Sequence, residues 1–204
     1  MALAWTTHIA DTTVTRAHKV NQLRIIAGQW RGRKLAFPDV AGLRPTPDRV
    51  RETVFNWLMP VLPGARCLDL FAGSGALGFE AASRGARQVV LVERDTQALA
   101  QLRAHVATLA ATQVQVVVAD ALHYLAGTAQ PFDIALLDPP YDQPELLATS
   151  CVQLEASGWL APKAYIYLET RGKQGLPTLP ANWELKHSKQ AGQVGYHLVV
   201  RSTR

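Results

Sequence analysis

The chain has 204 residues, of which 48% are hydrophobic and 18% are charged. This composition is typical of a packed globular protein and excludes a disordered chain, and the length suits one sizeable α/β domain with a small addition. The sequence has neither an apolar run long enough to cross a membrane nor a signal-peptide pattern. Cys67 and Cys151 lack CxxC spacing, which fits a reducing cytoplasm and argues against a zinc site. We therefore expect a cytoplasmic protein without a metal or a membrane segment.

The net charge of +5 is concentrated in the first part of the chain. Residues 1–60 hold nine Lys or Arg against four Asp or Glu, whereas residues 61–204 hold twelve of each kind. A localised basic region indicates a polyanionic partner, with nucleic acid the first candidate. A solvated surface without a partner would have the same composition, so charge alone leaves both interpretations open.

Residues 1–21 are rich in Thr and show no periodicity, so we interpret them as a loose tail. Residues 22–38 alternate as two short strands around a turn that contains Gly28 and Gly32, which predicts a β-hairpin. Trp30 lies in this turn, where its ring either stacks on a nucleic acid or packs the hairpin onto the rest of the protein.

Residues 44–60 predict a helix. Thr46 is placed to cap it, Pro47 suits its first turn and Pro60 ends it. The apolar positions recur with helical spacing and predict the buried face, which comprises Val50, Val54, Trp57 and Leu58. The polar positions share a different face, which comprises Arg49, Glu52 and Asn56.

From residue 63 onward, predicted strands alternate with predicted helices. The strands fall in residues 65–73, 87–94, 114–120, 132–138 and 164–170, and a final strand pair lies within 183–201 around Gly192 and Gly195. The helices fall in residues 76–85, 95–110, 121–127 and 143–160. This alternation predicts the α/β class, with a mostly parallel seven-stranded sheet covered by helices on both faces and an N-terminal β-hairpin extension. Ligands of such sheets bind beyond the carboxyl ends of the strands.

Acidic side chains stand at three successive strand ends around a glycine-rich turn, "DLFAGSGALG". Gly73 and Gly75 allow a close approach of backbone N–H groups to a ligand, but Asp69 just before them would repel a pyrophosphate and could pair with an ammonium group. Glu93 follows about 20 residues later, where an acid binds ribose hydroxyls, and Asp120 could accept from an adenine amino group. The order of ammonium, ribose and adenine favours S-adenosylmethionine over NAD. The alternative is that these acids only cap the helices that follow them.

The fourth strand ends in "DPPY", residues 138–141. An exocyclic amine on a nucleobase is a poor nucleophile, because its lone pair is delocalised into the ring. Asp138 and the carbonyl group of Pro139 could hold its two N–H groups, with Pro140 fixing the turn, while Tyr141 stacks on the base. These residues predict methylation of a ring-conjugated amine by positioning. The alternative is a turn that merely ends the strand.

Together these motifs resemble the class I S-adenosylmethionine-dependent methyltransferases, which have a Rossmann-like fold. With "RIIAGQWRGRKL" and "LRPTPDRVRETVFNWL" the chain is similar to the bacterial RsmD family over residues 22–204. The resemblance implies a cofactor site formed by Asp69, Phe71, Gly73, Ser74, Gly75, Glu93, Asp120 and Ala121, with Thr46 and Asn56 covering it. It implies a catalytic loop of Asp138, Pro139, Pro140 and Tyr141. It implies RNA contacts through Arg24, Arg31, Arg33, Lys34 and Arg49.

The resemblance also implies an activity, which is methylation of a guanine N2 amine in 16S rRNA of the small ribosomal subunit. It divides the chain into the tail (1–21), an RNA-facing and cofactor-covering unit (22–60) and the methyltransferase domain (61–204), and we expect a monomer without a metal. DPPY alone does not separate guanine N2 from adenine N6, so a DNA or RNA adenine-N6 methyltransferase is the alternative. A protein or small-molecule methyltransferase and a non-catalytic RNA-binding module fit the basic region and the intact motifs less well.

Overall fold

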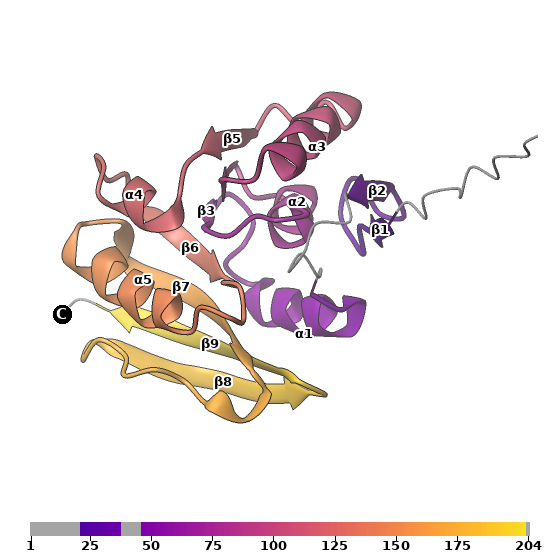
Figure 1. Cartoon of the computed structure of the whole chain (residues 1–204). Helices are drawn as coiled ribbons and strands as arrows, with labels where there is room; N and C mark the ends of the chain where they lie inside the picture. The colour runs from indigo at the N-terminus through magenta and orange to yellow at the C-terminus, as the bar shows by residue number, and fades with distance from the viewer. Residues whose placement is uncertain (1–20, 38–45, 203–204) are drawn as a thin grey trace, which may run out of the picture.

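The computed structural model describes residues 21–37 and 46–202. Its centre is a seven-stranded sheet with helices on both faces (Figure 1). The predicted tail lies outside the described residues except for Asn21, which begins a strand. None of the described helices is long and apolar enough to cross a membrane.

The sheet has the strand order β5-β4-β3-β6-β7-β9-β8. Strands β3, β4, β5, β6 and β7 run parallel to one another, and β9 runs antiparallel to both β7 and β8. The strands are β3 (Arg66–Asp69), β4 (Gln88–Glu93), β5 (Val114–Val118), β6 (Phe132–Leu137), β7 (Leu160–Arg171), β8 (Trp183–Ala191) and β9 (Val194–Ser202). The predicted fold class is confirmed, although Gly195 lies inside β9 and not in the turn before it.

The helices form two layers, each with its own apolar core. The helices are α1 (Asp48–Leu58), α2 (Ala76–Ser83), α3 (Thr96–Thr108), α4 (Ala121–Leu125) and α5 (Glu145–Ala156), and a 3₁₀ turn, η1 (Gly172–Gln174), follows β7. Helices α1, α2 and α3 cover one face of the sheet, and α4 and α5 cover the other (Figure 1). The sheet is therefore buried on both sides, and its ligand-binding edge lies where β3, β4, β5 and β6 end.

Helix α1 begins one residue later than a Thr46 cap would require. Pro47 occupies the N-cap position, and no side chain caps the helix. The hydroxyl group of Thr46 instead donates to the carboxylates of Asp138 and Glu169, which is why it is not available to the helix. Val50, Val54 and Leu58 are buried as predicted, whereas Trp57 is half-buried and stacks on His187 of β8, with ring centroids 4.8 Å apart.

The N-terminal hairpin pairs β1 (Asn21–Arg24) with β2 (Lys34–Phe37) in antiparallel register, as the sequence predicts. It lies beyond α1 and α2, away from the sheet (Figure 1). The carboxylate of Glu80 on α2 is fully buried and accepts the backbone N–H groups of Ile26 at 2.8 Å and Ala27 at 3.0 Å. Arg84 donates to the same carboxylate at 2.7 Å, and buried Arg51 of α1 lies 3.6 Å from it.

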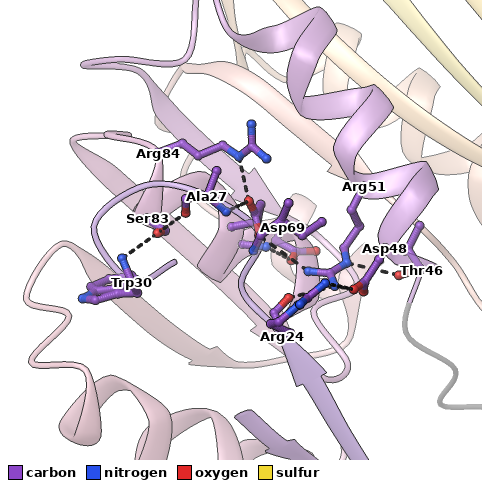
Figure 2. A network of polar contacts seen from close by, with 12 residues as sticks. Arg24, Ala27, Trp30, Thr46, Asp48, Arg51, Asp69, Ser83 and Arg84 are labelled. Atoms are coloured by element: carbon purple, nitrogen blue, oxygen red, sulfur yellow. Dashed lines mark hydrogen bonds and ion pairs between the residues drawn. The ribbon is translucent and has the colours of Figure 1, made fainter. Parts of the chain in front are cut away.

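Ser83, at the end of α2, fixes the hairpin turn. Its hydroxyl group donates to the carbonyl of Ala27 at 2.6 Å and accepts from the backbone N–H of Trp30 at 3.0 Å (Figure 2). The side chain of Trp30 is half-buried and packs against the first core, so it packs the hairpin onto the domain. Arg51 reaches from α1 to the carbonyl oxygen of Arg24 and to Asp48, which attaches the hairpin to a second helix (Figure 2).

Candidate active site

A cavity of about 310 Å³ opens at the carboxyl ends of β3, β4, β5 and β6. Most of the residues predicted for the cofactor and the reaction line it together. They are Thr46, Asp69, Phe71, Gly73, Ser74, Glu93, Asp120, Ala121, Asp138, Pro139, Pro140 and Tyr141. The strand-end rule therefore places these side chains in one cavity, although they are spread over nearly 100 residues of sequence.

Asp69 ends β3 at the base of this cavity and is almost fully buried. Its Oδ2 atom accepts the backbone N–H of Gly78 at 2.9 Å, whereas its Oδ1 atom has no partner among the described residues. Burial raises the pKa of this carboxyl group, the Gly78 hydrogen bond opposes the rise and the nearby charge of Glu93 adds to it, so that the pKa is about 7. A buried oxygen without a donor is costly to maintain, so this atom favours a cationic or N–H-bearing ligand group.

The glycine-rich turn adopts the conformation that its sequence requires. Gly73 donates its backbone N–H to Glu93 Oε2 at 2.7 Å. Gly75 has φ of +78°, and a Cβ there would come within 2.6 Å of the Phe79 ring and 2.7 Å of Leu102. Gly75 is not among the residues lining the cavity. Its place in the motif is explained by the turn and by close packing, and a direct contact between Gly75 and a ligand stays a prediction.

Glu93 and Asp120 each bind the backbone while they face the cavity. Glu93 Oε1 accepts the N–H groups of Arg94 and Asp95, both at 2.8 Å. Asp120 caps α4 by accepting from Leu122 at 3.0 Å, and its other oxygen lies 3.2 Å from the Arg94 guanidinium group. Asp120 can therefore cap α4 and bind a ligand at the same time, because a carboxylate has enough acceptor positions for both roles.

The catalytic loop follows β6, whose residues from Ile134 to Leu137 are fully buried. Asp138 Oδ2 accepts from the Thr46 hydroxyl group at 3.2 Å. Burial raises the pKa of Asp138 well above its ordinary value, the charge of Glu169 adds to the rise, and the hydrogen bond from Thr46 opposes it. Tyr141 is 36% exposed and so presents its ring at the opening.

Glu169, near the end of β7, is a site residue that sequence reasoning missed. It is 3% exposed. Its Oε1 accepts from the Tyr141 hydroxyl group at 2.6 Å, and its Oε2 accepts from the hydroxyl groups of Tyr167 at 2.8 Å and Thr46 at 3.3 Å. The signal was present in the sequence, because Glu169 is an acid at the end of an apolar strand, as are Asp69 and Asp138.

Two predicted residues on α1 lie away from the cavity. Asn56 and Arg49 are exposed and do not line it. Asn56 does not line the cavity because the helix turns this polar face to solvent while Val54 and Phe55 pack inward, and its contact with the cofactor stays a prediction. Among residues 46–58, Thr46, which precedes the helix, is the residue that lines the cavity.

The residues predicted to contact RNA are all exposed: Arg24, Arg31, Arg33, Lys34 and Arg49. Arg24 lies 3.6 Å from Asp48, which partly offsets its charge. Arg31, Arg33 and Lys34 make no ion pair with another described residue. Within residues 21–37 and 46–202, no cluster of His, Cys, Asp and Glu has the geometry to hold a metal ion.

The sheet order and the cavity at its carboxyl edge define the class of Rossmann-like class I methyltransferases. A family model described as "Conserved hypothetical protein 95" matches residues 23–200. Ribosomal RNA small subunit methyltransferase D from Escherichia coli is 52% identical over 90% of this chain and 92% of its own length. The Haemophilus influenzae protein of the same name is 46% identical over 87% and 93%.

A solved structure of an Escherichia coli protein, provisionally named a methyltransferase, superposes with a TM-score of 0.84 at 52% identity. The superposition covers 90% of this chain and 100% of that chain. The protein belongs to the ribosomal RNA small subunit methyltransferase D family, which confirms the resemblance found in the sequence.

Proposed function

We propose that this protein transfers a methyl group from S-adenosylmethionine to the N2 amine of a guanine in 16S rRNA. The observation that carries the proposal is one cavity that joins the three strand-end acids to Asp138 and the loop of Pro139, Pro140 and Tyr141. Membership of the family supports ribosomal RNA as the substrate, because its curated members are named for methylation of small-subunit ribosomal RNA. The choice of guanine N2 rests on the resemblance in the sequence.

The residues of the cavity fit this cofactor. The unpartnered Oδ1 of Asp69 suits the ammonium group of the methionine part, and Glu93 and Asp120 stand farther along the same edge for the ribose hydroxyls and the adenine amine. Bound S-adenosylmethionine supplies a methyl group on a positively charged sulfur, which makes that carbon electrophilic. The protein's task is then to orient the acceptor amine.

Asp138 and the Pro139 carbonyl group are the acceptors for the two N–H groups of the target amine. Holding both N–H groups turns the nitrogen lone pair toward the methyl carbon, which is catalysis by positioning. Tyr141 covers the flat face of the base, an interaction worth about 1–3 kcal/mol per base. The target base must leave its stack to reach this loop, which is easiest where the RNA is single-stranded.

The methylated amine must lose a proton, and Asp138 is the group placed to receive it. Its raised pKa makes its carboxylate a stronger base than an ordinary Asp. Asp138 must be ionised to accept the amine's N–H group before transfer. The proton can pass from Asp138 to water through the open side of the cavity.

The segment of residues 22–60 is proposed as the RNA-facing unit of the molecule. Arg31, Arg33 and Lys34 lie on the turn and the second strand of the hairpin, whose turn is bonded to α2. Phosphate contacts of this kind set the position of an RNA without reading its sequence. We propose a cytoplasmic monomer that acts on the RNA of the small ribosomal subunit.

The direct test is tritium transfer from labelled S-adenosylmethionine to undermethylated small subunits, naked 16S rRNA and DNA in parallel, followed by nucleoside analysis. N2-methylguanosine from ribosomal RNA is the expected product. N6-methyladenosine, from RNA or from DNA, would instead establish the adenine alternative and refute the guanine assignment.

Asp138→Ala tests the role of the loop. We expect it to abolish transfer while cofactor affinity, measured by calorimetry, stays close to that of the native protein. Asp142→Ala is the matched control, because Asp142 is exposed and does not line the cavity. Normal turnover by Asp138→Ala would remove the role assigned to this carboxylate.

A further inference from the structure

The positioning of the amine by Asp138 and Pro139 leaves the buried carboxylate of Glu169 without a role in methyl transfer. We propose that Glu169 selects guanine as the acceptor by accepting the N1–H that neighbours the target amine. This inference rests on the proposed function, and it names the group that distinguishes guanine from adenine in that site.

Glu169 can be reached from the loop that holds the base. It lines a second cavity, of about 240 Å³, together with Pro139, Pro140 and Tyr141. The same three loop residues line the cofactor cavity, where Asp138 lies, so a base bonded to both carboxylates must lie across the loop that the two cavities share. The second cavity is also lined by residues that follow Glu169 along the chain, which are Thr170, Arg171, Gln174, Gly175, Leu176 and Pro177.

Asp138 and Glu169 lie close enough for a hydrogen bond between their carboxyl groups, which helps to raise the pKa of Asp138, and they form a pair of acceptors once Asp138 is ionised. The Thr46 hydroxyl group lies between them, 3.2 Å from Asp138 Oδ2 and 3.3 Å from Glu169 Oε2. An ionised carboxylate can only accept hydrogen bonds. The pair therefore suits a ligand edge that carries two adjacent donors, and it disfavours an edge on which a donor is followed by an acceptor.

Guanine and adenine differ in this respect. On its Watson–Crick edge guanine presents the N2 amine next to N1–H, which are two donors side by side. Adenine presents the N6 amine next to N1, which has a lone pair and no proton. With the amine held by Asp138, guanine gives Glu169 a donor, whereas adenine sets a lone pair against a carboxylate. Specificity of this kind combines an attraction for one base with a repulsion of the other.

The hydrogen bonds of Glu169 hold it in place and leave acceptor capacity. A carboxylate has about four acceptor positions, and the hydroxyl groups of Thr46, Tyr141 and Tyr167 donate to Glu169. Two of these hydroxyl groups bind Oε2 and one binds Oε1, so Oε1 keeps more of its capacity. No described Lys or Arg forms an ion pair with Glu169. The N1–H of the base would therefore donate to a carboxylate that no cation neutralises, and such a charge-assisted hydrogen bond is stronger than one between neutral groups.

The test replaces the target guanine with 2,6-diaminopurine in a reconstituted RNA substrate. Diaminopurine keeps the N2 amine but has a lone pair in place of N1–H and an amine in place of O6. The change at O6 is the same for every protein variant, so a change of the rate ratio between variants reports the donor assigned to Glu169. We expect the native protein to methylate guanine about 10- to 100-fold faster than diaminopurine, the range of one charge-assisted hydrogen bond. Initial rates of methyl transfer on the two RNAs give this ratio.

Glu169→Gln is the decisive variant, because its amide can donate to the N1 lone pair of diaminopurine. We expect its guanine rate to fall at least tenfold and the ratio between the two RNAs to approach one. Tyr167→Phe is the matched control, because it removes one donor to Glu169 and keeps the carboxylate. We expect its ratio to remain that of the native protein, whatever its rate.

The possible outcomes distinguish a failure of the Glu169 inference from a failure of the proposed function. An equal loss on both RNAs in Glu169→Gln would show that Glu169 only supports Tyr141, and would overturn the inference while leaving the proposed function intact. Equal rates of the native protein on both RNAs would overturn it as well. Absence of guanine methylation by the native protein would remove the proposed function and this inference together. Cofactor affinity and thermal unfolding of each variant show whether it is folded.

Discussion

The backbone at Gly28 lies so close to Ser83 that a Cβ on Gly28 would come within 1.9 Å of the Ser83 carbonyl oxygen. The same carbonyl oxygen accepts the N–H of Gln29 at 2.8 Å, so it cannot move without breaking that bond. Gly28 also has φ of +82°, which disfavours any side chain. The hairpin turn and the end of α2 are therefore in contact through their backbones.

Gly28→Ala should detach the hairpin turn from α2. Because the clash is with backbone, we expect a loss of about 3 kcal/mol in the free energy of unfolding, or local undocking instead. Hydrogen exchange at the amides of Ile26 and Ala27, which bind Glu80, reports undocking directly. Gly32→Ala is the control, because Gly32 has the same φ but no atom within 4 Å of its Cβ position. We expect it to cost about 1 kcal/mol, and equal effects of the two changes would contradict the docking account.

Asp69 should make cofactor binding depend on pH. Its pKa of about 7 in the free protein means that it is largely protonated below that pH. An ammonium group beside it favours the ionised form, so binding lowers the pKa and releases a proton. Affinity for S-adenosylmethionine should therefore rise up to tenfold per pH unit between about pH 5 and 7 and level off above. Calorimetry in buffers of different ionisation enthalpy measures the proton released.

Asp69 also predicts the pH dependence of stability without cofactor. Its folded pKa, about 7, is raised above the ordinary 3.8, so the folded state binds more protons than the unfolded state between these values. The free energy of unfolding should then fall as pH rises through this window. Asp69→Asn should make this fall smaller, leaving the part due to Asp138, whose pKa is also raised, and should abolish the proton release on cofactor binding. An Asn variant with the native pH profile would show that another group titrates.

Tyr141 should contribute through its hydroxyl group as well as its ring. Stacking alone predicts that Phe replaces Tyr without loss and that Ala does not. The 2.6 Å hydrogen bond to Glu169 changes the expectation for Tyr141→Phe. We expect a fall in turnover of about tenfold, the cost of a hydrogen bond to a charged group, and a larger fall for Tyr141→Ala. Full activity of the Phe variant would mean that the bond does not hold the loop during transfer.

The exposed cations of the hairpin should determine the salt dependence of RNA binding. Replacing Arg31, Arg33 and Lys34 with Ala should lower the slope of log affinity against log salt by about 0.7 to 0.9 for each phosphate that is no longer neutralised. Arg103→Ala is a control for a single exposed cation, because Arg103 lies on α3 and not on the hairpin itself. An unchanged slope in the triple variant would mean that the basic hairpin is only a solvated surface.

The sequence predicts the fold and half of the site for a common reason. Asp69, Glu93, Asp120 and Asp138 each follow an apolar strand, and parallel strands place their carboxyl ends at one edge. These four positions can be predicted because an apolar strand followed by an acid is a local sequence pattern, and every parallel sheet places such strand ends at the same edge. The same rule, applied to β7, would have included Glu169.

What the sequence did not predict depends on contacts between segments far apart. Thr46 binds Glu169 across 123 residues, and a helix-cap pattern explained the same Thr equally well. Asn56 has the spacing of a polar helix face, but periodicity does not say whether that face meets solvent or a ligand. Arg51 is buried although it is charged, because it pairs with Glu80 on another helix. No local pattern identifies such a partner.

Helix α2 binds the cofactor side of the molecule and the hairpin through residues that are two positions apart. Gly78 donates its N–H to Asp69, and Glu80 holds the amides of Ile26 and Ala27. Along a helix, two residues span only about 3 Å. The geometry of α2 therefore fixes the separation between its contact with Asp69 and its contact with the hairpin, and no flexible loop lies between these two contacts. Under the proposed function, a phosphate bound by the hairpin and a methyl donor bound near Asp69 would both be attached to α2, and the RNA would reach the methyl donor at a constant distance.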